Sequence, residues 1–390
     1  MWMDPERYTD STYGKVQPVP GLGYRAYYPN TLPPLVELAS DTVTRLADAE
    51  ASLGRLAGAG RLLPNPHLLI RSYLLREALA SARIEGTQAS LLGVLEAEAD
   101  DAEYTPDIEE VLNYVAAMEQ GLTRLDTLPF SLRLVRDMHA VLMDGVRGRE
   151  RLPGEFRTSQ NWIGPPGSTI QSARFVPPPP GELSNLLSDW ERFVHQNQGI
   201  SVLVQSGLLH YQFETIHPFL DGNGRMGRLL IVFHLVLNGR LPQPLLYLSS
   251  YFERHRDEYY DKLQGVRERG DLDAWLRFYL TGMETQANDA VTRAERLVDL
   301  RESYRARVVE STRSQAVTLV DSLFANPIIT ARRVERSLDV KRPTSLRMLD
   351  QLQDLAILTE MAPGPRRQRR FMAAEILRVL EAEDSNNPPT

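Results

Sequence analysis

Residues 215–230 read TIHPFLDGNGRMGRLL, and a mostly apolar run, residues 229–237, follows directly. Gly222, Gly224 and Gly227 allow the backbone to turn tightly and to present its N–H groups. The apolar run predicts a buried central helix, whose start would add the positive end of a helix dipole. The stretch therefore predicts a loop that binds an anion and then opens a helix.

The charged and polar side chains of this loop have the chemistry of a phosphate site. Arg225 and Arg228 carry guanidinium forks that match phosphate oxygens. Asp221 is a hard oxygen ligand of the type that Mg²⁺ takes beside phosphates. His217 enters just before the loop, where an imidazole can act as a general base. Each residue alone has a plainer interpretation as a turn residue or a core histidine, but the whole set in this order favours phosphate chemistry.

Residues 217–228, HPFLDGNGRMGR, resemble the HPFxDGNGRxxR signature of Fic-domain proteins, and every fixed position matches. The resemblance implies an all-helical Fic core that transfers AMP from ATP to a Ser, Thr or Tyr hydroxyl of a protein. It implies that His217 takes the proton from that hydroxyl and that Asp221 holds Mg²⁺. The nucleotide-binding residues that it implies are Gly222, Asn223, Gly224, Arg225, Met226, Gly227 and Arg228.

A second segment, residues 81–86, reads SARIEG and resembles the family's inhibitory motif, [S/T]xxxE[G/N]. In isolation, Gly86 would be an ordinary helix cap and Glu85 a solvated acid. The resemblance implies an inhibitory segment formed by Ser81, Glu85 and Gly86, in which Glu85 pairs with Arg228. A carboxylate on that guanidinium would replace the γ-phosphate oxygens of ATP and stop the nucleotide from binding in a reactive pose.

Residues 161–164 and 173–176 are short β-prone pieces in a turn-rich region, and they predict a hairpin. A plain surface loop is the alternative. The resemblance favours the family's flap, a hairpin over the active site whose exposed edge can align a peptide by main-chain pairing. The flap residues that we expect are Asn161, Trp162, Ile163, Gly164, Phe175 and Val176.

Tyr259 and Tyr260 are neighbours in a predicted helix. They suit ordinary amphipathic packing, but in relatives a tyrosine pair at this place lines the adenine pocket. Stacking of an aromatic ring on a base contributes about 1–3 kcal/mol. Both tyrosines are therefore candidates for nucleotide binding.

The composition indicates an ordinary globular protein of more than one domain, with 390 residues and a net charge of −7. The chain has no cysteine, which excludes disulfides and thiolate metal sites. No apolar run approaches the length of a transmembrane helix, and the first ten residues do not resemble a secretory leader. We expect a cytoplasmic protein that does not associate with membranes.

The chain divides by its pattern into six regions, and the fold class that we expect is all-α apart from a short β-hairpin flap and a C-terminal winged helix-turn-helix. The regions are an N-terminal arm (1–34), an N-terminal helical region (35–130), a Fic core (131–285), a connector helix (286–312), a winged-helix domain (313–380) and a disordered tail (381–390). A last core helix is expected over residues 273–281. Residues 364–370, GPRRQRR, would form the wing, and Thr330 would cap a helix.

Charge is uneven along the chain. Residues 326–371 hold ten Lys or Arg against five Asp or Glu, and the remainder holds 34 against 46. A basic C-terminal module can bind DNA, although a winged helix can equally bind protein. The partners that we expect are ATP, a target protein that includes the chain itself as a candidate, and DNA or protein at the C-terminal module.

Three alternatives stay open. Relatives can remove AMP, in which case Glu85 would activate water, and others transfer different phosphate-containing groups. The protein can also be a DNA-binding regulator in which the Fic core senses nucleotide. By resemblance, a homodimer is a further expectation.

Overall fold

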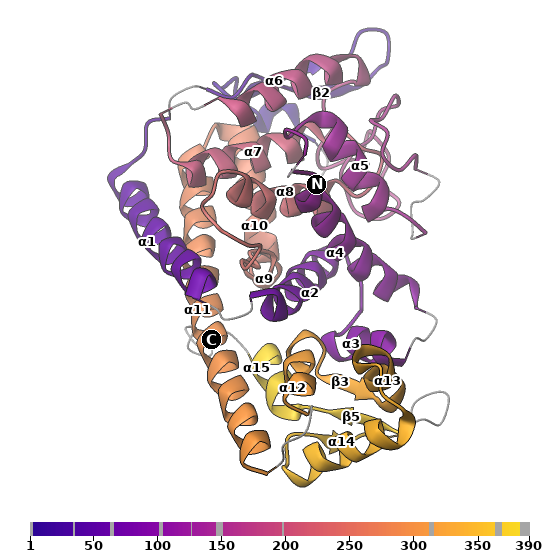
Figure 1. Cartoon of the computed structure of the whole chain (residues 1–390). Coiled ribbons are helices and arrows are strands. Elements are labelled where there is room, and N and C mark those ends of the chain that lie inside the picture. Colours follow the sequence, from indigo (N-terminus) through magenta and orange to yellow (C-terminus); the bar gives the residue numbers. More distant parts are fainter. Residues whose placement is uncertain are drawn as a thin grey trace.

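The computed structural model describes residues 3–33, 36–62, 66–100, 104–125, 127–145, 151–196, 199–311, 316–362 and 369–382. It is mostly helical, as the sequence predicts, and it contains two small antiparallel sheets (Figure 1). The helices that precede the C-terminal module are α1 (Ser40–Leu62), α2 (Pro66–Ile84), α3 (Leu91–Asp100), α4 (Pro106–Leu125), α5 (Leu132–Leu142), α6 (Leu183–His195), α7 (Val202–Ile216), α8 (Asn223–Leu237), α9 (Ser249–Arg254), α10 (Arg256–Arg269) and α11 (Leu272–Ser311). Two short 3₁₀ turns, Pro5–Arg7 and Pro180–Glu182, complete this part.

Helix α8 is the buried centre that the apolar run predicts. Residues 225–235 are all buried, and α7 packs along the helix on one side while α4 packs on another. A helix that is apolar on every side is stable only when other helices surround it. The loop that opens α8 therefore rests on a rigid element.

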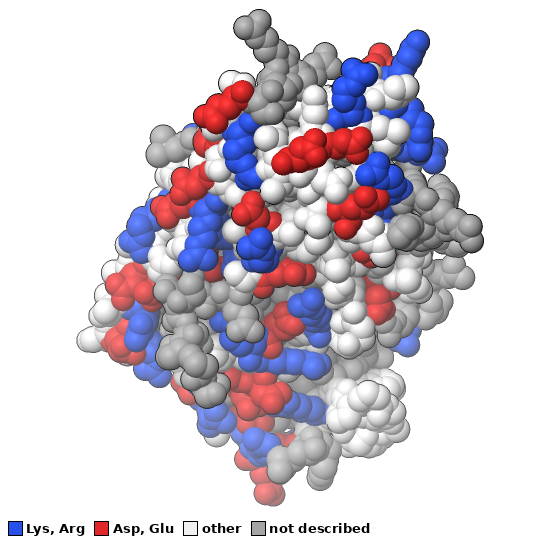
Figure 2. Space-filling view, turned by 90° about the horizontal axis from the view of Figure 1, so that it is seen from below, with Lys and Arg blue, Asp and Glu red and all other residues white. Residues whose placement is uncertain are grey.

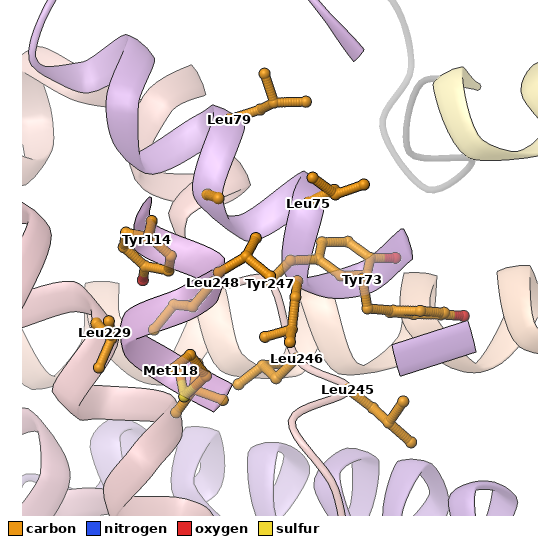
Figure 3. Packing of buried hydrophobic residues seen from close by; sticks show 14 of the residues in the cluster. Tyr73, Leu75, Leu79, Tyr114, Met118, Leu229, Leu245, Leu246, Tyr247 and Leu248 are labelled. Carbon is orange, nitrogen blue, oxygen red and sulfur yellow. The ribbon is translucent and has the colours of Figure 1, made fainter. Parts of the chain in front are cut away.

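Helix α2, whose end carries residues 81–84 of the segment 81–86, is also embedded in the core. Figure 3 shows Tyr73, Leu75 and Leu79 of α2 in one cluster with residues of α4, α8 and the segment 245–248. Glu77 of α2 is buried and accepts hydrogen bonds from Ser249 N at 2.9 Å and Tyr114 Oη at 3.0 Å. The motif 81–86 is therefore held at the end of a fixed helix.

Helix α11 differs from the prediction. We expected a core helix over residues 273–281 and a separate connector from residue 286, but α11 is one continuous helix of 40 residues. Gly282 lies inside it without breaking it, because its missing side chain leaves room for the Tyr251 ring, which a Cβ would approach to 2.7 Å. The helix packs along α1 and continues to the C-terminal module (Figure 1). None of the helices among the described residues is long and apolar enough to cross a membrane.

The C-terminal module consists of α12 (Ala316–Ala325), β3 (Ile328–Thr330), α13 (Ala331–Leu338), α14 (Arg342–Asp354), β4 (Thr359–Glu360), β5 (Arg370–Met372) and α15 (Ala374–Glu381). Its three antiparallel strands lie in the order β3–β5–β4. Thr330 caps α13 by accepting a hydrogen bond from Arg333 N at 3.3 Å. Residues 364–368 of the expected wing (364–370) and residues 383–390 of the expected disordered tail (381–390) lie outside the described residues.

This module packs directly on the N-terminal helical region. Ser72 Oγ of α2 donates to Phe324 O at 3.1 Å, and Asn326 Nδ2 donates to Leu95 O of α3 at 3.2 Å. Both contacts are buried. The C-terminal module is thus fixed against the helix that carries residues 81–84 of the motif.

The N-terminal arm is a β-hairpin, and not merely an extended segment. Strands β1 (Gly14–Pro18) and β2 (Arg25–Pro29) pair antiparallel. Residues 19–24, VPGLGY, connect them, and Gly21 and Gly23 have positive φ angles of 73° and 68°. Tyr27 is fully buried, so the arm packs on the body through this side chain.

Candidate active site

The predicted loop opens onto a cavity of about 490 Å³. Its walls come from four parts of the chain: the end of α2 with α4, the flap region, the α7–α8 loop, and α10. The lining residues are Glu85, Thr87, Glu110, Trp162, Ile163, Gly164, Glu214, His217, Leu220, Asp221, Gly222, Asn223, Gly224, Arg225, Arg228 and Tyr260. A cavity of this size can enclose a nucleotide-sized ligand.

His217 ends α7 in a backbone conformation that few residues with a side chain adopt, with φ 48° and ψ 62°. Such a conformation persists only when its surroundings hold it. Here Arg157 Nε and Asn161 Nδ2 both donate to the His217 carbonyl, at 2.9 and 3.2 Å. Arg157, a buried residue that sequence reasoning missed, also donates to Ile216 O and Pro178 O.

The loop is closed by Asn223. Its Oδ1 accepts from Phe219 N at 2.8 Å, and its Nδ2 donates to Phe219 O at 2.8 Å. Gly222 has a φ angle of 74°, and its N–H donates to Asp221 Oδ1 at 2.7 Å. His139 stacks on the Phe219 ring at 3.6 Å and is a buried support of the loop, as expected of a core histidine. Asn223 thus lines the cavity but uses its amide to shape the loop.

Arg228 is fully buried and anchored by the segment 81–86. Its Nε donates to Ser81 Oγ at 2.9 Å, and its Nη2 donates to Ser81 O at 2.9 Å and to Glu85 Oε1 at 2.7 Å. Gly224 allows this arrangement, because a Cβ there would lie 2.3 Å from Glu85 Oε1. Gly86 has a φ angle of 98° and ends the segment.

Arg225 is buried at the opposite wall. Its Nη1 lies 3.8 Å from Glu110 Oε2, and its Nη2 contacts Met143 Sδ at 3.3 Å. Its Nε and Nη1 have no hydrogen-bond partner within the described part of the chain. Buried guanidinium donors without partners are costly, and anionic oxygens in the cavity would satisfy them.

Two family descriptions match this chain. The Fic/DOC family N-terminal domain matches residues 43–123, and the Fic/DOC family domain matches residues 129–235. The chain therefore contains a Fic/DOC domain, preceded by the N-terminal domain of that family.

Curated relatives of this Fic chain include two mosquito proteins named protein adenylyltransferase Fic, from Aedes aegypti and Culex quinquefasciatus. Each is 32% identical over 206 residues, which cover 51% of this chain and 38% of the relative. The match therefore spans only about two-fifths of the length of these relatives.

Two solved structures share the fold. A Fic family protein from Desulfovibrio desulfuricans is 22% identical with a TM-score of 0.57, covering 88% of this chain and 98% of that chain. A Fic-domain-containing signaling protein from Bacteroides thetaiotaomicron is 19% identical with a TM-score of 0.50, covering 66% of this chain and 97% of that chain.

The Fic signature residues do not all reach the cavity. Met226 and Gly227 lie on the buried part of α8 and do not line the cavity. Tyr260 lines it, whereas Tyr259 is fully buried, stacks on Phe252 at 4.5 Å, and shares a hydrogen bond of 2.8 Å with His210 Nε2. The ring of Tyr259 thus packs in the core and supports Tyr260 from behind.

The expected flap region is less regular than the predicted hairpin. Instead of two strands, the structure contains one isolated antiparallel bridge, Ile163 to Phe175. Ile163 N donates to Phe175 O at 2.8 Å, and Phe175 N donates to Ile163 O at 3.0 Å. Trp162 is 41% exposed and lines the cavity, while Phe175 and Val176 are buried on the other side. The tetraproline 177–180 follows at once and cannot donate further ladder bonds.

His217 is held in its neutral form. Burial, together with Arg157 and Arg267, lowers its pKa to about 3, so the imidazole is neutral at physiological pH. Its Nδ1 is buried and has no hydrogen-bond partner within the described residues. A neutral imidazole beside a phosphate loop can act as a general base.

Glu214 is a buried residue of this cavity that sequence reasoning missed. It lies one helical turn before His217, and Gly227 leaves room for it, because a Cβ there would be 2.5 Å from Glu214 Oε1. Burial raises its pKa to about 7, Arg228 opposes this rise, and Glu85 adds to it. The spacing i, i+3 from His217 on one helix was the signal that could have found it.

Asp221 fits a Mg²⁺ ion that is shared with phosphates. Its carboxylate is 45% exposed and borders the cavity, 4.0 Å from Arg225 Nη2. The described residues contain no group of three or more His, Cys, Asp or Glu that could hold a metal alone. One carboxylate plus substrate oxygens is the usual protein environment of Mg²⁺.

Proposed function

We propose that this protein is a protein adenylyltransferase that moves AMP from ATP to a hydroxyl side chain of a protein. The observation that carries the proposal is that one cavity holds both a neutral, buried His217 and two buried Arg225 donors, Nε and Nη1, that make no hydrogen bond within the described residues. The names of the curated relatives support the same reaction.

In this mechanism the backbone of the α7–α8 loop and the start of α8 receive the phosphates of ATP. Arg225 satisfies its buried Nε and Nη1 on phosphate oxygens. Mg²⁺ bound at Asp221 would neutralise part of the phosphate charge. The target hydroxyl attacks the α-phosphorus, the bond from that phosphorus to the pyrophosphate oxygen breaks, and the imidazole of His217 accepts the hydroxyl proton. Catalysis then comes mostly from positioning and from fixed charges.

Glu85 acts as a brake in this proposal. Burial would raise its pKa, but the Arg228 guanidinium outweighs this effect and holds the pKa below its usual value. The ionised carboxylate therefore occupies Arg228 at neutral pH, where it competes with the outer phosphate of ATP for the same donors.

The test is intact-protein mass spectrometry after incubation with ATP and Mg²⁺, with labelled ATP and a cell lysate as a second target source. We expect AMP addition in wild type, more in Glu85→Gly, and none in His217→Ala. Arg83→Gly is the matched control, because it also introduces a glycine at this helix end. The Arg83 side chain, unlike that of Glu85, bonds Ala89 O instead of Arg228. If Glu85→Gly labelled neither itself nor any lysate protein, this result would contradict the proposal.

AMP removal uses the same residues, so it needs its own measurement. A target first labelled by Glu85→Gly would be offered to wild type without ATP. Release of AMP that depends on Glu85 would make removal the main activity. If GTP, CTP or UTP reduced labelling by ATP, the competing nucleotide would be a candidate for a different donor.

DNA binding by residues 313–380 needs its own evidence, which starts from the charges on this module. On the described part of this module, Arg342 lies 3.5 Å from Glu335, and Arg369 pairs with Glu360 at 2.8 Å. Figure 2, which views the molecule from this end, shows basic side chains interspersed with acidic ones. A complex whose affinity falls steeply with salt would be required to support DNA binding.

A further inference from the structure

The N-terminal arm forms a hydrophobic cluster with the flap that is separate from the main core. From the arm it takes Met3, Val19 and Tyr27, and from the flap it takes Phe175 and Val176, all of them buried. The Tyr27 and Phe175 ring centroids are 5.8 Å apart. Residues from the two distant parts of the sequence thus share one small core.

The arm also occupies the outer main-chain edge of the flap. Met3 N donates to Ala173 O at 2.5 Å, and Tyr27 N donates to Val176 O at 2.9 Å. Phe175 bonds Ile163 on the other edge. Residues 173–176 therefore run between the arm on one side and the cavity-lining piece 161–164 on the other.

Two chains of contacts lead from the arm to the catalytic loop. In the first, Tyr27 packs on Phe175, and the Arg267 guanidinium lies 4.0 Å from the centre of that ring. Arg267 Nε donates in turn to Thr215 Oγ1 at 3.1 Å, two residues before His217.

The second chain passes through the base of the flap. Tyr24 Oη donates to Gln160 Oε1 at 3.2 Å, and Gln160 Nε2 donates to Asn161 O at 2.9 Å and Pro177 O at 3.0 Å. Asn161 Nδ2 donates to the carbonyls of His217 and Phe219. The arm is thus connected to both ends of the loop segment 217–219.

We propose that residues 3–30 are a positioning segment of the transferase site, which holds the flap at its outer edge and keeps it aligned with His217. The flap has a single bridge of its own, and an isolated two-stranded hairpin is marginal in water. The arm supplies the packing and the main-chain bonds that the flap lacks. The proposal rests on the proposed function for its catalytic consequence, but its structural consequence can be measured independently.

The experiment is hydrogen exchange by mass spectrometry on the full chain, with Tyr27→Ala and Tyr27→Phe. We expect exchange in peptides covering residues 161–176 to rise at least about tenfold in Tyr27→Ala and to stay near wild type in Tyr27→Phe, which keeps the ring. Exchange in α8 should not change. Tyr304→Ala is the matched control, because it removes an equally buried tyrosine that packs on Phe324 of the C-terminal module.

The catalytic part is measured in the Glu85→Gly background. Tyr27→Ala should lower AMP transfer about tenfold while the KM for ATP stays within about twofold, because the nucleotide loop is intact. A purely structural role would lower the melting temperature and leave transfer by the folded fraction unchanged.

The outcomes separate the two proposals. Unchanged flap exchange in folded Tyr27→Ala would overturn the positioning role, as would raised exchange with unchanged transfer. If Tyr27→Ala does not fold, Tyr24→Phe decides, because it removes only the bond to Gln160. It should raise exchange at residues 160–163 about threefold, and no rise would overturn the proposal. Absence of transfer in Glu85→Gly with an intact arm would instead refute the proposed function, whatever the flap does.

Discussion

The α7–α8 loop and the segment 81–86 meet at Arg228, but they are built differently. The loop is held by doubled contacts: Asn223 bonds Phe219 twice in buried positions, and two side chains donate to the His217 carbonyl. Glu85 makes one charged contact from a side chain that is 39% exposed. A buried, redundant network is expensive to open, whereas a half-exposed ion pair is not. This difference fits the proposed roles, in which the loop is a permanent nucleotide site and Glu85 is a reversible brake.

The largest effect is expected when the bonds that shape the α7–α8 loop are removed. Asn223→Ala removes both bonds to Phe219 and leaves that backbone N–H and C=O less satisfied. In the Glu85→Gly background, AMP transfer should fall about 100-fold or more, as expected for loss of a preorganised anion site. Unfolding should become easier by about 2–4 kcal/mol.

The matched control for this change is Asn238→Ala at the other end of α8, where Nδ2 donates to His234 O at 2.9 Å. Transfer should be nearly unaffected there. If Asn223→Ala retained most of its transfer rate, the loop would not depend on this amide, and the contrast with the brake would fail.

Local chemistry explains why the loop could be predicted from the sequence. Gly222 adopts the positive φ that the turn needs, and α8 begins directly after it, at Asn223. The apolar run 229–237, directly after the glycine-rich loop, favours a buried helix. These features depend on neighbours in sequence, so the sequence carries them.

The residues that were missed act through distant contacts. Arg157 stands in a turn-rich stretch, and its bonds to residues 216 and 217 exist only once the flap region packs on α7. Glu214 looks like any helical acid until α8 covers it. The arm hairpin had a signal in its PGLG turn, but its burial depends on the flap. We expected a helix end before residue 286, but α11 continues there because the Tyr251 side chain packs against Gly282.

The second-largest effect is expected at Glu214, which lies between the α7–α8 loop and the segment 81–86. Its pKa in the folded protein is about 7, above the usual 4.5. Between these values the folded state keeps a proton that the unfolded chain loses, so stability falls as pH rises from 4.5 to 7 and then levels off. The whole difference corresponds to about 3 kcal/mol.

Glu214→Gln stays neutral and should escape this loss. Its free energy of unfolding, measured in urea, should gain on wild type by about 3 kcal/mol between pH 4.5 and pH 8. A difference between variant and wild type that is the same at both pH values would mean that folding does not raise the pKa of Glu214, so that this carboxylate is ionised at neutral pH, as Glu85 is.

A smaller effect is expected at the brake itself. Glu85→Gln keeps the shape of the side chain but removes its charge, so Arg228 should release it more easily to ATP. We expect basal transfer to rise about tenfold, which corresponds to about 1.4 kcal/mol. Glu85→Asp, which keeps the charge, should rise less. Equal rates for wild type and Glu85→Gln, measured by initial-rate labelling, would mean that charge does not set the brake.

The smallest effect concerns Ser81, which belongs by sequence to the inhibitory motif but accepts a hydrogen bond from the Nε of Arg228, a residue that we propose binds phosphate. Ser81→Ala leaves that buried N–H without its acceptor, while the bond from Nη2 to the Ser81 carbonyl remains. One such bond contributes about 1 kcal/mol. In the Glu85→Gly background, where no brake is left to weaken, the KM for ATP should rise about fivefold with kcat little changed. A lower KM would assign Ser81 to the brake alone. The expected rise would mean that the inhibitory segment both blocks Arg228 and orients it, so removing the whole segment should activate less than removing Glu85.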